Sequence, residues 1–339
     1  MDGPLRLLSP SSICPGCPLT ETCGAALTDY ACPETWSSEM PGGNPVSHPN
    51  KPGTMEELRD LGGPEFDDIV ARPTPRLELP PYTAQIRHRR SLRGYLDEPV
   101  YFIRATEVIK SKRVTTAAEM RRALLLKPEQ RLVVLLFDRD KLIESIWSRG
   151  AALVRELVDA GYDAIVSPSF STYTPRPRTD YMINMKRCLI YFEALQIAGA
   201  HAIPRVAWMV SHDARRLARW AQDNRTVEMV AIDLSTYRSP ADWQTQIEGL
   251  EIFDSMTGRR ISYLINGSTT KERCEQLYAI AGFDRIRISN ATTQVRVPAK
   301  TIRSTGDQTG PTFKARLTLR RGIVDEAARR FRREGRQAA

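Results

Sequence analysis

Residues 161–210 read GYDAIVSPSF STYTPRPRTD YMINMKRCLI YFEALQIAGA HAIPRVAWMV, and this stretch decides the fold. Residues 163–166 are a short apolar run without helical spacing that stops before Pro168, which predicts a buried strand. Apolar residues then recur at mostly helical steps from Asp180, a capping residue, to Gly199. Residues 203–209 form the next apolar run. The stretch therefore predicts a strand–helix–strand unit, with reactive side chains where its strands end.

The same alternation continues on both sides of this unit. Further strands are predicted at 100–104, 131–137, 227–232, 261–265 and 285–288, and further helices at 116–125, 141–160, 213–222, 240–253 and 270–280. Strands that alternate with helices indicate a parallel sheet, either closed as a barrel or open and doubly wound. The number of strands and the single run of alternation favour an α/β barrel of the TIM type, regular or irregular, over residues 95–310.

The two ends of the chain differ in composition from this central domain. Residues 41–94 are rich in proline and glycine, which predicts a linker. At the other end, residues 311–339 form a basic tail, with a strand expected at 315–319 and an amphipathic helix at 323–336. Residues 1–40 form a separate cysteine-rich arm.

Four of the six cysteines lie in this arm, at Cys14, Cys17, Cys23 and Cys32. Thiolates at such short spacing suit a tetrahedral zinc or an iron–sulfur cluster, because a small, loop-rich segment has too little apolar surface to fold alone. Prolines directly follow three of them, as is common among iron–sulfur ligands. We therefore expect a 4Fe–4S cluster or zinc here, with four free thiols as the alternative.

The charge of the chain is uneven as well as positive. The formal net charge is +9, and residues 311–339 hold nine basic against three acidic residues. A second basic cluster spans residues 87–93. Such clusters favour a nucleic-acid partner, although they also suit a solvated helix and tail. The sequence contains neither a long apolar run nor a signal peptide, so we expect a cytoplasmic protein without a membrane partner.

The central stretch also resembles a known family. The run Ser-Pro-Ser-Phe-Ser-x-Tyr at 167–173, followed by a helix and by Gly-Ala-x-Ala-Ile-Pro-x-Val-x-Trp at 199–208, is similar to the bacterial and phage domain of unknown function 4417 over roughly residues 130–270. The family's usual pattern has an aspartate where this chain has Ser169. The resemblance implies a phage or mobile-element context, and it carries no assigned activity.

Two carboxylates stand out, because each directly follows a predicted strand. These are Asp138 and Asp233, and a pair of carboxylates in a barrel mouth suits base-exchange or glycosidic chemistry, in which an oxocarbenium-like centre needs a nearby negative charge. Asp233 is the candidate nucleophile or general base. For Asp138 the simpler interpretation is a helix cap.

The remaining candidates are polar, aromatic and cationic residues that could bind a phosphate or stack on a base. They are Ser167, Ser169, Phe170, Ser171, Tyr173, Arg176, Arg178, Trp208 and Asn266. Phe170 is equally suited to fill the core at the strand end. Arg205 lies inside a predicted strand and therefore requires a buried acid or a ligand, unless it points out of the barrel.

Motifs for nucleotide hydrolysis, dinucleotide binding, zinc peptidases and esterases are missing from the sequence. Two functions remain. The first is a barrel enzyme that acts on nucleic acid or nucleosides, as a base-modifying or transglycosylase-type enzyme. The second is a non-catalytic, metal-stabilised protein that binds nucleic acid. If Asp138 and Asp233 converge in a pocket, the enzyme is favoured. If they cap helices, the binding protein is favoured.

Overall fold

The computed structural model describes residues 55–75, 77–111, 113–172, 178–237, 239–267, 270–290 and 309–337. Its centre is a sheet of eight parallel strands with the order β5-β4-β3-β2-β1-β8-β7-β6. The strands are β1 (Tyr82–Ile86), β2 (Val100–Arg104), β3 (Arg131–Leu135), β4 (Ala164–Val166), β5 (Ala202–Ile203), β6 (Met229–Asp233), β7 (Ser262–Asn266) and β8 (Ile286–Asn290).

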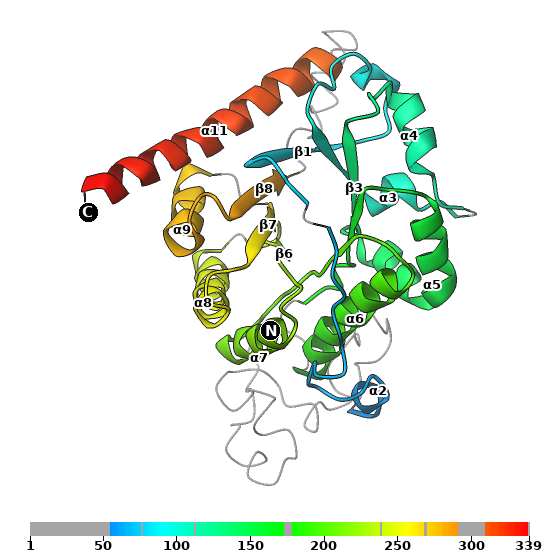
Figure 1. Cartoon of the computed structure of the whole chain (residues 1–339), viewed down its shortest axis with the longest axis vertical. Coiled ribbons are helices and arrows are strands. Elements are labelled where there is room, and N and C mark those ends of the chain that lie inside the picture. The colour runs from blue at the N-terminus through cyan, green and yellow to red at the C-terminus, as the bar shows by residue number, and fades with distance from the viewer. Residues whose placement is uncertain are drawn as a thin grey trace, which may run out of the picture.

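The sheet curls until its two edge strands meet. A parallel bridge joins Arg205, just past β5, to Ala231 of β6. The amide of Val206 donates to the carbonyl of Ala231 at 2.9 Å, and the amide of Ala231 donates to the carbonyl of Pro204 at 2.8 Å. Because this single bridge closes the ring, the chain is a nearly closed TIM-type barrel, as the alternation of strands and helices predicts (Figure 1).

Helices cover the outside of the barrel. They are α3 (Ala105–Val108), α4 (Ala117–Leu124), α5 (Asp140–Asp159), α6 (Arg178–Ile197), α7 (Ser211–Asp223), α8 (Pro240–Met256), α9 (Lys271–Ala281) and α11 (Thr309–Gln337). Side-chain caps fix several of their starts. Thr116 and Glu119 form a capping box on α4, and Ser239 and Thr270 cap α8 and α9. A short turn, η5 (Arg90–Leu92), lies between β1 and β2.

The inside of the barrel is a packed apolar core separate from the outer one. Its members come from alternate positions of the strands: Val100, Phe102, Val133, Leu135, Phe137, Ala164, Val166, Ile203, Ala231 and Leu264. Leu77 and Leu79, which precede β1, belong to the same cluster. The barrel is therefore filled from the amino-terminal ends of its strands and is not a pore.

Residues 64–81, here called the strap, connect α2 (Met55–Asp60) to β1. The strap runs in the same direction as α6, since Lys186 contacts Asp68, Glu193 accepts from the amide of Val70, and Gln196 accepts from the amide of Arg72. The indole of Trp220 on α7 donates to the carbonyl of Ile69 at 2.9 Å. Polar side chains of two helices thus hold the strap before it reaches the bottom of the barrel.

Helix α11 is a docked terminal helix. It packs beside α9 and η5, and Figure 1 shows it lying along the outside of the barrel. Its buried residues are Phe313, Leu317, Val324, Ala327 and Ala328. Ion pairs link Lys314 to Asp97 and Lys271 to Glu326. The described part of the basic tail therefore covers the outside of the barrel beside α9, η5 and β1.

Three predicted boundaries are wrong. The linker predicted at 41–94 contains β1, the strap and the buried Leu58, Phe66 and Ile69. The strand predicted at 203–209 ends after Ile203, because Pro204 has no amide hydrogen to donate. The strand expected at 315–319 is part of α11, whose apolar residues recur at helical spacing. Within the described ranges, no helix has the length and apolarity to cross a membrane.

Candidate active site at the mouth of the barrel

The last interior layer at the carboxyl ends of the strands is polar, unlike the layers below it. Side chains alternate between the two faces of a strand, so Asp233 and Asn266 face inward like Ala231 and Leu264, two residues earlier. Gln85 of β1 and Ser289 of β8 reach the same layer, since both hydrogen bond within it. This layer forms the mouth of the barrel, where the active sites of such barrels lie.

Hydrogen bonds join these four side chains into one network, here called the mouth network. Gln85 Nε2 donates to Asn266 Oδ1 at 2.6 Å and to Ser289 Oγ at 3.3 Å. Asn266 Nδ2 then donates to Asp233 Oδ1 at 2.8 Å, and the amide of Ser235 donates to the same oxygen at 3.1 Å. Oδ1 is thereby fixed, while no residue in the described ranges donates to Oδ2. Asp233 is partly exposed, so Oδ2 is the open side of this carboxylate.

Gly267 allows the chain after β6 to lie this close to the end of β7. Its φ is +112°, and a Cβ at this position would come within 2.4 Å of Ser235 Cα. A side chain here would push away the turn that supplies the Ser235 amide. The glycine therefore helps to position Asp233.

Three further side chains, those of Tyr237, Arg205 and Thr172, are linked to Asp233 through the electrostatics of the Tyr237 phenol. Burial raises the pKa of the Tyr237 phenol, and the neighbouring Asp233 raises it further, while Arg205 and the hydroxyl of Thr172 lower it. Arg205 itself is 4% exposed. Asp233, Arg205 and Thr172 therefore all act on the phenol of Tyr237, and they come from different segments of the chain.

Asp138 lies in the loop that follows β3 and has a structural role. Its Oδ2 accepts from the amide of Thr106 at 2.9 Å and its Oδ1 accepts from the amide of Arg139 at 2.9 Å. Arg104 lies 3.8 Å away. Asp138 therefore caps α3, the helix after the neighbouring strand, and not the helix that follows it in sequence.

The loop after β4 is mostly buried, contrary to the expectation of a binding loop. Ser167 Oγ accepts from the amide of Arg205 at 2.8 Å, and Ser171 Oγ donates to Asp140 Oδ1 at 2.6 Å. Phe170 is fully buried, edge-on to Trp147 and under the guanidinium of Arg187. Phe170 thus fills the core. Ser169 is partly exposed. Tyr173, Arg176 and the side chain of Arg178 lie outside the described residues.

Trp208 is also a core residue, so the prediction that it stacks on a substrate is wrong. It is 1% exposed, lies parallel to Phe253 and donates to the carbonyl of Gln246 at 3.3 Å. The strand expected around it does not form, and α8 packs over its indole at Gly249. Of the predicted site residues, Asp233 and Asn266 are the two that the structure joins by a hydrogen bond at the mouth.

Sequence reasoning missed Gln85, Thr172 and Tyr237. Gln85 was hidden because β1 follows two prolines in a stretch that resembles a linker. The alternation of Tyr82, Ala84 and Ile86 with polar residues is the signal that could have identified this strand.

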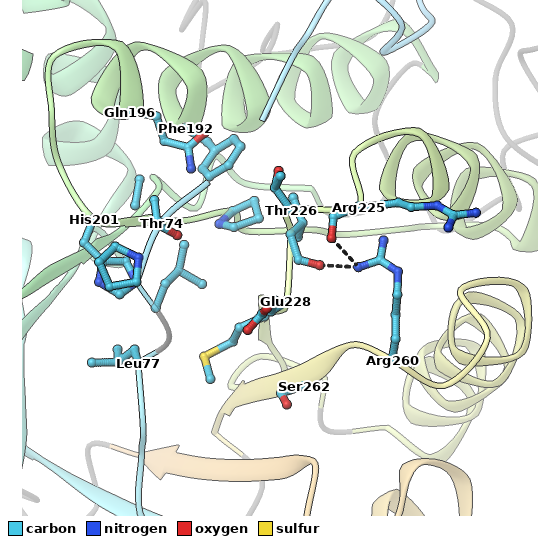
Figure 2. Close-up of a pocket in the computed structure, with 16 residues that line it drawn as sticks. Thr74, Leu77, Phe192, Gln196, His201, Arg225, Thr226, Glu228, Arg260 and Ser262 are labelled. Carbon is cyan, nitrogen blue, oxygen red and sulfur yellow. Dashed lines mark hydrogen bonds between the residues drawn. The ribbon is translucent and has the colours of Figure 1, made fainter. Parts of the chain in front are cut away.

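A cavity of about 300 Å³ lies at the opposite, amino-terminal end of the barrel, where β5 and β6 diverge. Its walls include Leu77 of the strap, His201, Glu228 and Ser262. Figure 2 shows that Arg260 turns its guanidinium to backbone carbonyls, those of Arg225 at 3.3 Å and Val227 at 2.6 Å. Arg260 therefore stabilises the chain after α7. In barrels of this type residues at this end serve stability more often than catalysis.

The described residues contain no cluster of three or more histidine, cysteine or acidic side chains that could hold a metal ion. Cys14, Cys17, Cys23 and Cys32 lie outside the described residues. Cys188 and Cys274 are buried free thiols.

No protein-family model matches the sequence, and no curated protein matches it. Solved structures do resemble it in fold. A putative fructose-1,6-biphosphate aldolase from Coccidioides immitis has 10% identity and a TM-score of 0.47, over 80% of this chain and 96% of that one. A 4-hydroxy-2-oxoglutarate aldolase/2-deydro-3-deoxyphosphogluconate aldolase from TTHB1 has 12% identity and a TM-score of 0.40, over 72% and 94%. At these values the similarity assigns no activity.

Proposed function

We propose that this protein is an enzyme acting on nucleic acid or nucleosides, with Asp233 at the barrel mouth as its reactive carboxylate. The observation that supports this most directly is the mouth network, which orients one oxygen of Asp233 and leaves the other open. A carboxylate held in this way at the carboxyl end of a barrel strand is pre-organised for catalysis.

The reaction that suits this carboxylate is glycosyl transfer. Asp233 Oδ2 would attack or stabilise the anomeric carbon as the bond from this carbon to the leaving base breaks, and the base takes up a proton from solvent. Water or a second base then attacks that carbon and releases Asp233. Tyr237, a phenol whose pKa is raised further by burial, is protonated at neutral pH and would donate a hydrogen bond to the substrate.

Basic side chains at the rim of the mouth favour a polyanionic substrate. Arg89 and Arg90 lie in the loop after β1 and are exposed. His88 lies in the same loop, and its amide donates to the carboxylate of Glu107 in α3 at 3.2 Å. This hydrogen bond fixes the loop beside the end of β2. Together with the net charge of +9, this rim supports nucleic acid as the substrate class. The resemblance to the domain 4417 family adds a phage or mobile-element setting to the proposal.

The decisive experiment compares two carboxylates at the same end of the barrel. Purified protein is incubated with single-stranded and duplex oligonucleotides, a transfer RNA mixture and free nucleosides, and the released base is measured by mass spectrometry. We expect release by the wild type and none by Asp233→Asn, with both melting at similar temperatures. Asp138→Asn is the matched control and should lower the melting temperature while it keeps activity. Equal activity of Asp233→Asn and wild type would refute the proposal.

The cysteine arm forms a second part of the proposal. We propose that Cys14, Cys17, Cys23 and Cys32 bind a 4Fe–4S cluster or zinc, a donor set that fits both groups. Protein purified without oxygen should contain either about four irons per chain with a broad absorption band near ~400 nm or one colourless zinc. A variant with the four cysteines replaced by serine should contain neither metal. Metal retained by that variant would contradict this site.

A non-catalytic nucleic-acid-binding protein is the second candidate, and the role of Asp138 favours it. Because Asp138 caps α3, it is not available to pair with Asp233 as a second catalytic carboxylate. A binding protein predicts oligonucleotide affinity that is unchanged in Asp233→Asn and reduced in an Arg89→Ala, Arg90→Ala double variant. Its affinity should fall steeply with salt, and without base release by the wild type.

A further inference from the structure

Arg205 is a buried cation that pairs with no carboxylate of the described residues. It is 4% exposed, and no acidic side chain in the described ranges lies within 4.0 Å of it. Nε has no hydrogen-bond partner there, and Nη1 lies 3.6 Å from the sulfur of Cys188, a weak acceptor. The stem is fixed, because Arg205 pairs with Ala231 and its amide donates to Ser167 at 2.8 Å.

The other buried cations in the part of the chain that the structure describes are paired with carboxylates. Lys186 pairs with Asp68, Arg187 with Glu144 and Arg216 with Glu65, although all three are less than 3% exposed. A guanidinium does not lose its proton at any ordinary pH. Arg205 is therefore buried in its charged form, which is less stable there than in water. A buried charge without a partner is strongly unfavourable. Among these four cations, Arg205 therefore has the environment expected of a ligand-binding residue.

Two more donors lie beside this guanidinium. The hydroxyl of Thr172 is buried and makes no hydrogen bond of regular geometry among the described residues, although it lies next to the phenol of Tyr237. The charge of Arg205 lowers the pKa of Tyr237, so this phenol lies within electrostatic reach of the guanidinium. A guanidinium and two hydroxyls from three different segments can surround a tetrahedral oxyanion, whose several acceptor oxygens match that set.

We propose that Arg205, Thr172 and Tyr237 form a binding site for one phosphate group. The proposal rests on the proposed function to the extent that this phosphate belongs to the nucleotide whose sugar lies at Asp233. It adds a specificity: the enzyme should act on nucleotides or nucleic acid and discriminate against unphosphorylated nucleosides. Arg205 is then a binding residue that orients the substrate and not the reacting group.

The test uses inorganic phosphate and the whole protein, and it requires no turnover. Melting temperatures are measured with increasing phosphate, against sodium chloride at equal ionic strength and against acetate. We expect phosphate to raise the melting temperature of the wild type by several degrees, and acetate and chloride to leave it nearly unchanged. Arg205→Met should melt higher than the wild type without phosphate, because it removes a buried charge, and should show no response to phosphate.

Two variants make the result specific. Tyr237→Phe keeps the ring and should weaken the phosphate response several-fold. Arg187→Met is the matched control, since it removes a buried cation that has a carboxylate: it should melt lower than the wild type and keep the phosphate response. If Arg205→Met instead melts lower and the wild type ignores phosphate, Arg205 is structural and the inference is wrong.

The two proposals fail separately. Phosphate binding that depends on Arg205, without base release from any substrate, would support this site and refute glycosyl transfer. Base release from nucleosides and nucleotides at equal rates, with no response to phosphate, would support catalysis at Asp233 and refute the phosphate site.

Discussion

Asn266 donates a hydrogen bond of 2.8 Å to Asp233, so the amide at the end of one strand orients the carboxylate at the end of the next. Asn266→Ala should therefore lower the rate of base release by about tenfold to a hundredfold, since a hydrogen bond to a charged group contributes about 1.5–3 kcal/mol. Base release and the melting temperature are measured together. Asn290→Ala provides the control, because Asn290 contacts Tyr82 on the outer face of the sheet. An equal loss of rate in both variants would exclude an orienting role.

The packing of α8 against Trp208 should require glycine at position 249. A Cβ at this position would lie 2.0 Å from Nε1 of the buried Trp208. Gly249→Ala should destabilise the protein by about 1–3 kcal/mol or more, because α8 has to move off the indole. Gly322→Ala on α11 is the matched control. Nothing lies within 4 Å of a Cβ there, and the change should stabilise the helix by up to about 1 kcal/mol. Chemical unfolding in urea measures both changes, and similar signs for the two would contradict this account.

Replacement of Asp254, which lies between the barrel and its helices, should strongly destabilise the protein. It is 2% exposed, accepts from Arg285 at 3.0 Å and from the hydroxyl of Tyr263 at 2.8 Å, and so connects α8 to β7 and β8. Asp254→Ala should cost about 3–5 kcal/mol, because it leaves the guanidinium without its partner. The double variant with Arg285→Met should recover part of this loss in the free energy of unfolding. No recovery would show that the ion pair itself is not the cause.

His201 should make stability depend on mildly acidic pH. Burial and, to a lesser extent, the charge of Arg131 lower the pKa of His201 in the folded protein. An unfolded histidine titrates near a pKa of about 6.5, so below that pH the unfolded chain binds a proton that the folded chain does not. The free energy of unfolding should therefore fall as the pH decreases from about 6.5 toward the lowered pKa. In His201→Gln this contribution should be absent, as urea unfolding between about pH 5 and 7.5 would measure. Identical slopes in the two proteins would disprove it.

Most of the barrel could be predicted from apolar runs, and the reasons for the failures are local. Residues 100–104 and 131–135 form strands within the predicted limits, because each is a buried run of β-favouring residues. β1 escaped prediction because its five buried residues include the polar Thr83 and Gln85, which face the interior of the barrel. β5 is short because of Pro204.

The sequence predicts where the candidate site lies better than it predicts what each residue does there. The rule that functional residues follow the ends of strands located Asp233 and Asn266. It could not separate them from Asp138, Phe170 and Trp208, because a helix cap, a core ring and a substrate contact use the same residue types at the same place. Only the partners of each side chain distinguish these roles. Arg205 is the exception, since a cation inside a strand already implies an acid or a ligand.

The strap has a consequence for how this protein is made. Leu77 and Leu79 complete the inside of a barrel whose other strands are all synthesised later, and the carbonyl of Ile69 receives its hydrogen bond from Trp220, 151 positions further along the chain. β1 in turn pairs with β8, near the end of the barrel. Contacts between such distant segments form slowly. During translation these leucines therefore lack their native packing partners until the later strands have been synthesised, and apolar segments exposed for that long are prone to aggregation.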